Sequence, residues 1–315
     1  LTTGIYNAWV SFDDLTSANL ISFILILFIF LFFLIENLSR KKAQYHNYRN
    51  DGLNIPKRKR LKGMNSILAF LFCFFIFFVS FIFPVSQMFY WTLKYPTYLN
   101  SIDFWDLNIN TLYLVTTSSL ILLLTSFASN FSNRITKSKY LELLNTLSVS
   151  GYALPGVILS IALITFISWF SDLSGLNIKS IFIGSTLGLI TAYFIRFYSL
   201  SFNSLRSNYL KININVDESA YLLGYNKYAV FSKVHIPILR RSCFLIIALV
   251  AIEIIKELPI TLILRPFNFE TFATVAFSYA EQDLLEAAAF PSLCLLMWST
   301  LFIFFSFKFF LLEKE

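Results

Sequence analysis

Apolar residues are grouped along this chain in long, uninterrupted runs. Seven runs can be distinguished, at residues 20–36, 66–90, 109–130, 152–171, 180–198, 242–262 and 290–312. Each has roughly the 17 to 25 residues that a helix rising about 1.5 Å per residue needs to cross about 30 Å of hydrocarbon. Because a backbone in lipid must satisfy its hydrogen bonds within its own segment, each run is predicted to be a helix.

The pattern within the runs decides the fold class. A membrane β-barrel needs strands of about ten residues in which apolar and polar side chains alternate, whereas these runs are apolar on every face. We therefore expect an all-α fold, a polytopic membrane helix bundle of about seven transmembrane helices.

The composition agrees with a lipid bilayer as the solvent. Hydrophobic residues make up 57% of the chain and charged residues 14%, and 37 of the 315 residues are Phe. This is more apolar surface than one soluble core hides. Cys73, Cys243 and Cys294 lie inside or at the edges of predicted helices without any C-x-x-C spacing. They are expected to pack, with no disulfide or metal role.

The charged residues between the runs predict an orientation in the membrane. One face has the loop 37–65, with nine cations, and two further basic loops, whereas the opposite face has only Lys94, Lys179 and Arg265. Since cytoplasmic loops carry the excess of Lys and Arg, the basic face is assigned to the cytoplasm. The N-terminus is then periplasmic and the C-terminus cytoplasmic. The net charge of +7 is explained by this topology, and no nucleic-acid binding is expected.

The chain organisation suggests two modules. The number of spans is odd, the chain begins with Leu1, and the opening around Thr3 and Ala18 is in register with Thr274 and Ala289 before the last run. Such an internal echo is typical of a repeat. We expect 1–36 to be the end of a first permease module, with a periplasmic segment and its last transmembrane helix. Residues 37–65 would then be a basic cytoplasmic linker, and 66–315 a complete second module of six helices.

The longest polar segment after the linker, 199–241, lies on the cytoplasmic face and carries the main motif. It reads Asp217-Glu218-Ser219-Ala220-Tyr221-Leu222-Leu223-Gly224, then nine residues, then Val234-His235-Ile236-Pro237. This resembles the signature loop of bacterial ABC importer permeases, E-A-A, three residues, G, nine residues and I-x-L-P. The residues that match are Glu218, Ala220, Gly224 and Pro237, while Ser219, Val234 and Ile236 are conservative departures.

Local physics predicts a helix-turn-helix in this loop. Acids near Asp217 favour the positive end of a helix, and Gly224 can end that helix in a left-handed conformation. A second helix is expected from Lys227 to Val234, with Pro237 stopping it. The resemblance implies that the coupling loop, 205–241, receives motion from a cytoplasmic ABC ATPase dimer.

A second stretch narrows the resemblance. Residues 256–274 resemble the K-E-L-P-x-T-L-x-L-R-P-F-x-F-x-T-x-A segment of the ferric iron permeases in this superfamily, and residues 1–6 resemble the end of their first half. Those proteins are fused pairs of six-helix halves. The resemblance therefore implies a bacterial inner-membrane permease that translocates ferric iron from a periplasmic solute-binding protein, together with a first permease module from the same full-length chain.

Charged residues within the last part of the sixth run are a candidate gate or ion cluster. Glu253, Lys256 and Glu257 are three and four residues apart, so on a continuous helix they share one face and partly neutralise one another. Charges at this depth are costly and should face the protein interior. Arg265 is grouped with them. A structural ion cluster and a role in the translocation path both remain open.

Other functions have weaker support. Glu253, Lys256 and Glu257 would couple an ion gradient in a secondary transporter, but such a carrier needs no ATPase-coupling loop. Permeases for thiamine, polyamines or an anion share the loop. No metal-ligand spacing and no G-x-x-x-x-G-K-[ST] phosphate loop occur, so this chain is expected to be no enzyme and to bind no cofactor, with ATP used by the partner subunit.

Overall fold

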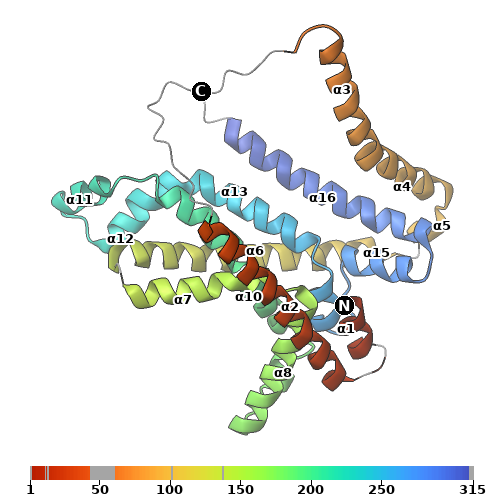
Figure 1. Cartoon of the computed structure of the whole chain (residues 1–315), viewed down its shortest axis with the longest axis horizontal. Coiled ribbons are helices and arrows are strands. Elements are labelled where there is room, and N and C mark those ends of the chain that lie inside the picture. The colour runs from red at the N-terminus through yellow and green to blue at the C-terminus, as the bar shows by residue number, and fades with distance from the viewer. Residues whose placement is uncertain are drawn as a thin grey trace.

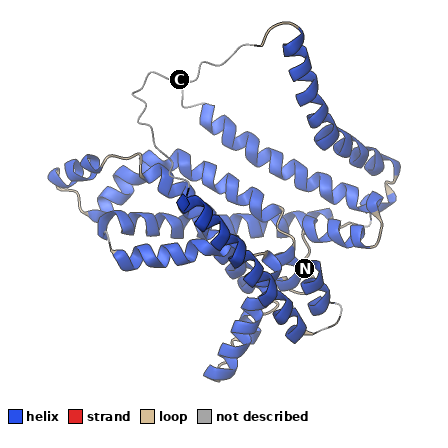
Figure 2. Cartoon of the chain, in the orientation of Figure 1, coloured by secondary structure: helices blue, strands red, loops and turns tan. Residues whose placement is uncertain are grey.

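The computed structural model describes residues 2–10, 12, 14–42, 61–100, 102–136 and 138–311. This part of the chain is helical with connecting turns and contains no strand (Figure 2). The predicted all-α class is therefore confirmed. Most of the predicted linker, residues 43–60, lies outside the described residues.

Three helices form the centre of the bundle. α6 (Phe104–Thr136), α10 (Thr186–Tyr209) and α13 (Ile236–Ile255) run side by side (Figure 1). Large side chains of α10 fill the space between them, and Tyr193 and Phe197 are almost fully buried. Burial of aromatic side chains of this size is the main favourable term that holds such helices together inside the protein.

The remaining long helices surround this centre. α16 (Leu285–Leu311) packs on α13 and on α4 (Phe83–Lys94), which follows α3 (Met64–Phe77) and a π-helical turn, η1 (Phe78–Ile82). α3, η1 and α4 have no buried residue. α3 in particular is largely apolar and exposed, which fits contact with lipid. α5 (Thr97–Asn100) connects α4 to α6.

Five helical segments in the described part are long and apolar enough to cross a membrane. They are Leu15–Phe32, Met64–Lys94, Phe104–Thr136, Gly156–Ser174 and Leu285–Lys308, and they confirm five of the seven predicted spans. The other two predictions coincide with α10 and α13. These central helices carry charges, including Arg196 and Glu253, whose side chains are 20% and 23% exposed.

The start of one predicted span was wrong. The run 152–171 was expected to be continuous, but a short 3₁₀ turn, η2 (Ser150–Ala153), separates α7 (Lys139–Val149) from α8 (Gly156–Ser174). Leu154 and Pro155 have extended backbone between them. Since a proline disfavours helical backbone in the residue before it, the helix cannot begin earlier.

The two central spans are also interrupted. The run 180–198 is divided at Gly184, which has φ 69°, into α9 (Lys179–Phe182) and α10. The run 242–262 is divided where α13 ends at Ile255 and α14 (Pro259–Leu264) begins. Pro259 lacks the N–H that a continuous helix would need at that position.

The two ends of the chain have the same local architecture. α1 (Thr2–Val10) precedes α2 (Leu15–Lys42), and α15 (Phe272–Glu281) precedes α16, so each end has a short helix followed by a long one. α2 extends beyond the predicted boundary at residue 36. α1 and α2 pack on α8 through Ile5, Ala8 and Ala18 against Val157 and Ile161. That the two ends are copies of one module stays a prediction.

Gly151 allows η2 to approach α10 closely. A Cβ at this position would lie 2.2 Å from the carbonyl oxygen of Ile195. Replacing Gly151 with alanine is expected to separate the two segments and lower the free energy of unfolding by about 1–3 kcal/mol, as overpacking typically does. Thermal melting of the purified transporter would measure the loss. Gly4→Ala is the control, because nothing lies within 4 Å of its Cβ; equal melting temperatures for the two variants would contradict the expectation.

Candidate functional site

The segment with the sequence motif projects from one end of the bundle, here called the loop end. It contains α11 (Ile214–Leu222) and α12 (Lys227–Val230) (Figure 1). Asn213 caps α11 by accepting a hydrogen bond from the N–H of Asn215. α11 therefore begins earlier than Asp217, and it ends before Gly224, whose φ of 84° is the left-handed conformation that the sequence predicted.

The expected end of the second helix was wrong. α12 begins at Lys227 as predicted, but it continues through a π-helical turn, η3 (Phe231–His235), directly into α13. Pro237 lies in the first turn of α13 and does not stop the helix. At the start of a new helical segment the missing N–H of a proline is tolerated, and a π-turn shifts the hydrogen-bond register there. One continuous helix thus runs from residue 227 to 255.

The tip of the loop presents an apolar surface. Glu218 and Ser219 are exposed, while Ala220, also on α11, is buried. Beyond them, Leu222 and Leu223 are 89% and 78% exposed, and Tyr228 is 84% exposed. Exposed apolar side chains gathered on one short segment are typical of a protein-binding surface.

Arg134, from the last turn of α6, fastens this loop to the bundle. Its Nε donates to Oδ2 of Asp217 at 2.6 Å. Its two terminal nitrogens donate to the backbone carbonyls of Tyr209, Ile212 and Asn213 at 3.1–3.2 Å. The guanidinium thus holds both α11 and the turn that leads into it, and a rigid fork of donors suits this role.

His235 lies on the other side of Asp217. Its side chain is fully buried in η3, and its Nε2 lies 3.1 Å from Oδ1 of Asp217. The ring stacks on Tyr209 with centroids 5.3 Å apart. Burial lowers the pKa of His235, which the charge of Asp217 partly opposes, so the imidazole is neutral at pH 7. We call Arg134, Asp217, His235 and Tyr209 the loop clamp.

The sequence pointed to only part of the loop clamp. The sequence predicts Asp217 near the start of a helix and places His235 in the signature loop, but neither pattern pairs them. Arg134 lies 83 residues before Asp217. The only available signal was a basic residue at the end of a span on the same face as the loop.

A second polar site lies inside the bundle, where the helices break. Oε2 of Glu257 lies 3.4 Å from Nε of Arg196 on α10, and the carboxylate side chain is only 8% exposed. Arg196 also donates to the carbonyl of Leu154 at 3.2 Å. The ion pair therefore connects the breaks before α8 and before α14. Gly156 leaves room for it, because a Cβ there would lie 2.6 Å from Oε1 of Glu257.

The predicted cluster of Glu253, Lys256 and Glu257 is thus only partly formed. Lys256 pairs with Glu253 at 2.7 Å, as expected. α13 ends at Ile255, so Glu257 does not share that helical face, and it pairs with Arg196, which the sequence did not indicate.

Arg265 does not join these residues. It forms an ion pair with Glu270, and Oγ1 of Thr274 donates to the same carboxylate at 2.6 Å. These contacts fix a turn in which Asn268 has φ 58° and Phe267 is 98% exposed. The structure therefore separates the predicted gate residues into three places.

Comparisons with curated proteins support the resemblance. Over 309 residues the chain is 22% identical to the Fe(3+)-transport system permease protein FbpB 2 of Haemophilus influenzae, which covers 96% of this chain. Over 259 residues it is 26% identical to the probable transport system permease protein NifC of Clostridium pasteurianum, across 76% of this chain and 87% of that one. No family model matches. The chain spans 59% of the length of the Haemophilus protein.

The fold is shared with solved ABC transporters. A chain of the bacterial alginate ABC transporter, in complex with an alginate pentasaccharide-bound periplasmic protein, matches with a TM-score of 0.62 and 15% identity over 76% of this chain and 92% of that one. A chain of a bacterial ABC transporter for import of alginate matches at 0.59 and 14%, over 77% and 95% respectively. The resemblance to ABC transporter permeases that the loop motif predicted is confirmed.

Proposed function

We propose that this chain is a membrane-spanning subunit of an ATP-driven importer, and that α11 and α12 couple it to a cytoplasmic ABC ATPase dimer. The observation that carries the proposal is an exposed apolar tip held rigidly by buried polar contacts. Leu222, Leu223 and Tyr228 are free to enter a groove on a partner, while Arg134 and Asp217 transmit force from that contact. The excess of cations at this end supports a cytoplasmic location.

The loop clamp and the continuous helix provide a path for the motion. A displacement of α11 moves Asp217, which is bound to the end of α6 through Arg134. A displacement of α12 moves the helix that runs through α13 to residue 255. That helix ends next to the Glu257–Arg196 ion pair and the break before α14. ATP-driven movement at the loop end would thereby change the packing in the middle of the bundle.

The solute we propose is ferric iron. Two observations support this solute. The Haemophilus relative is named a Fe(3+)-transport system permease, and the stretch 256–274 resembles a segment of the ferric iron permeases. Delivery by a periplasmic solute-binding protein is part of this proposal, and the alginate transporter is described with such a protein. The bacterial inner membrane, a first permease module in the same full-length protein and ATP hydrolysis by separate subunits complete the proposed assembly.

The coupling role can be tested on the exposed tip. In cells that carry the complete gene and its ATPase, Leu222→Asp is expected to reduce uptake of radiolabelled ferric iron by at least about tenfold, because a charge in an apolar contact is left desolvated. The folded bundle should be unaffected, since the side chain is exposed. Co-purification of the ATPase with the permease would measure the lost contact directly.

Tyr140→Asp is the matched control, because Tyr140 is 82% exposed near the loop end but lies on α7. Equal uptake by the wild type and Leu222→Asp would refute coupling through this tip. If neither wild type nor variant takes up ferric iron while the ATPase still co-purifies, the importer proposal stands and the solute is wrong; thiamine and polyamines would be tested next.

A further inference from the structure

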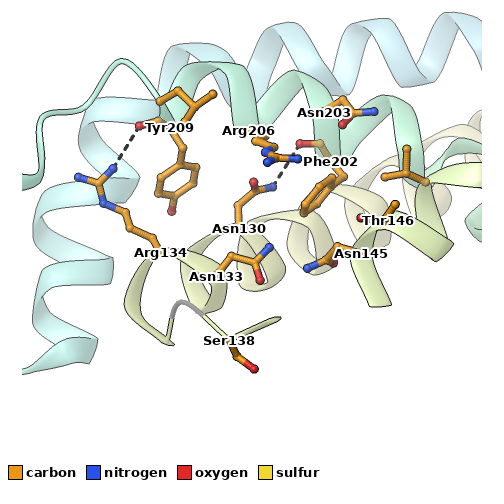
Figure 3. A pocket seen from close by; sticks show the side chains of 12 residues that line it. Asn130, Asn133, Arg134, Ser138, Asn145, Thr146, Phe202, Asn203, Arg206 and Tyr209 are labelled. Carbon is orange, nitrogen blue, oxygen red and sulfur yellow. Dashed lines mark hydrogen bonds between the residues drawn. The ribbon is translucent and has the colours of Figure 1, made fainter. Parts of the chain in front are cut away.

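A polar cavity opens at the loop end between α6, α7 and α10. Its volume is about 450 Å³, enough for a small ligand. Polar residues from all three helices line it (Figure 3). They include Asn133 on α6, Ser138 at the start of α7, and Asn203 and Arg206 on α10.

The charge of the described lining favours an anion. Two arginines line the cavity, and no described lining residue is acidic. The charge of Arg134 is balanced by Asp217 at 2.6 Å. Arg206 has no ion pair in the part of the chain that the structure describes, so it leaves one positive charge without a counterion. A ligand with one negative charge would balance the site.

The hydrogen-bond donors suit an oxyanion with several acceptor oxygens. The side-chain amide of Asn133 has no hydrogen bond to any described residue, and that of Asn203 has only a long one, 3.4 Å to Ser199. Ser138, the residue at the positive N-terminal end of α7, also lines the cavity. Guanidinium and amide groups of this kind bind phosphoryl oxygens well.

The carbonyl groups at the C-terminal end of α10 do not prevent an anion from binding in the cavity. An anion near the C-terminus of a helix is unfavourable when the last carbonyls are unpaired. Here the carbonyls of Arg206 and Asn208 accept from the N–H groups of Leu210 and Lys211, and Arg134 donates to the carbonyl of Tyr209, the last residue of α10. These acceptors are therefore satisfied within the protein.

We propose that this cavity binds the phosphoryl group of an anionic ligand through Arg206 and Asn133. Because Tyr209 and Arg134 line the same cavity and also belong to the loop clamp, an occupied cavity stiffens the attachment of α11. The proposed binding site follows from the residues that line the cavity and does not depend on the proposed function. Its effect on coupling rests on the proposed function.

Two experimental arms distinguish a soluble phosphate ester from a lipid headgroup. The complete transporter with its ATPase is placed in nanodiscs of phosphatidylcholine alone, and glycerol 3-phosphate is titrated while thermal melting is followed. In the second arm the nanodiscs contain increasing phosphatidylglycerol instead. In one arm the melting temperature is expected to rise and then to level off as more ligand is added. The arm in which this happens identifies the source of the phosphoryl group.

Variants decide whether this cavity is responsible. Arg206→Ala is expected to weaken the apparent affinity by at least about tenfold, the usual effect of losing a charge-assisted hydrogen bond, and Asn133→Ala by less. Arg206→Lys should recover part of the affinity. Lys211→Ala is the control, because Lys211 is an exposed cation nearby that does not line the cavity.

No saturable shift in either arm, or an equal loss in Arg206→Ala and Lys211→Ala, would overturn the proposal. These readouts need no transported solute, so they remain informative if iron uptake fails. If binding occurs and ATPase activity does not respond to it, the site is retained and its link to coupling is rejected.

Discussion

Replacing Asp217 with alanine is expected to abolish ATP-driven uptake while the chain still inserts and assembles. The substitution leaves the partly buried guanidinium of Arg134 without its carboxylate and removes the contact at 3.1 Å to His235. Removing one partner of a buried ion pair typically costs about 3–5 kcal/mol. This loss of free energy weakens the attachment of α11 to α6, so the loop should detach while the rest of the bundle stays folded. Uptake, together with protease sensitivity of residues 199–241, measures the effect.

An exposed ion pair supplies the control for Asp217. Asp172 pairs with Lys179 at 2.8 Å, but their side chains are 72% and 42% exposed. Such pairs contribute only about 0–1 kcal/mol, so Asp172→Ala should leave uptake and protease sensitivity unchanged. Equal behaviour of the two variants would show that the loop clamp does not transmit force.

The geometry of Arg134 gives a second discriminating variant. Arg134→Lys keeps the charge but cannot reproduce donation to one carboxylate and three backbone carbonyls from a planar fork. It should therefore lose most of the uptake. Retained uptake in Arg134→Lys would mean that charge alone, without the hydrogen bonds to the turn before α11, holds the loop.

Replacing Glu257 with alanine is expected to be the most destabilising change inside the bundle. It leaves the charge of Arg196, whose side chain is only 20% exposed, without its counterion. The free energy of unfolding should fall by about 3–5 kcal/mol. It also removes the acceptor for the N–H of Ile260, in the first turn of α14. Thermal melting of the assembled transporter measures the loss.

The double variant Arg196→Met, Glu257→Met separates the two roles left open for this site. Apolar replacement of both partners of a buried ion pair is often neutral or stabilising, so the double variant should melt at a higher temperature than Glu257→Ala. If it also transports, the pair is structural. If it is stable but does not transport, the ion pair acts in the translocation path. A double variant less stable than the single one would contradict the paired assignment.

The interior breaks show where prediction from the sequence failed. Pro155 and Pro259 were visible, and each disfavours helix in the residue before it. Whether a proline kinks, ends or merely begins a helix depends on neighbouring segments that satisfy the freed backbone groups. Pro237 was expected to end a helix, yet it lies within a continuous one, because the π-turn η3 absorbs the change of register.

The sequence by itself determined the features that depend on local or additive properties. Apolar runs predict helices because each residue contributes independently to transfer into lipid, and the conformation of Gly224 follows from the absence of a Cβ. The signature motif located the proposed coupling loop by its residues and their spacing. Only the tertiary structure decided that Asp217 meets Arg134, and that Glu257 meets Arg196 rather than Lys256. These partners lie 83 and 61 residues apart along the chain, and a pairing over such a distance is selected by the packing of whole helices, which no local pattern encodes.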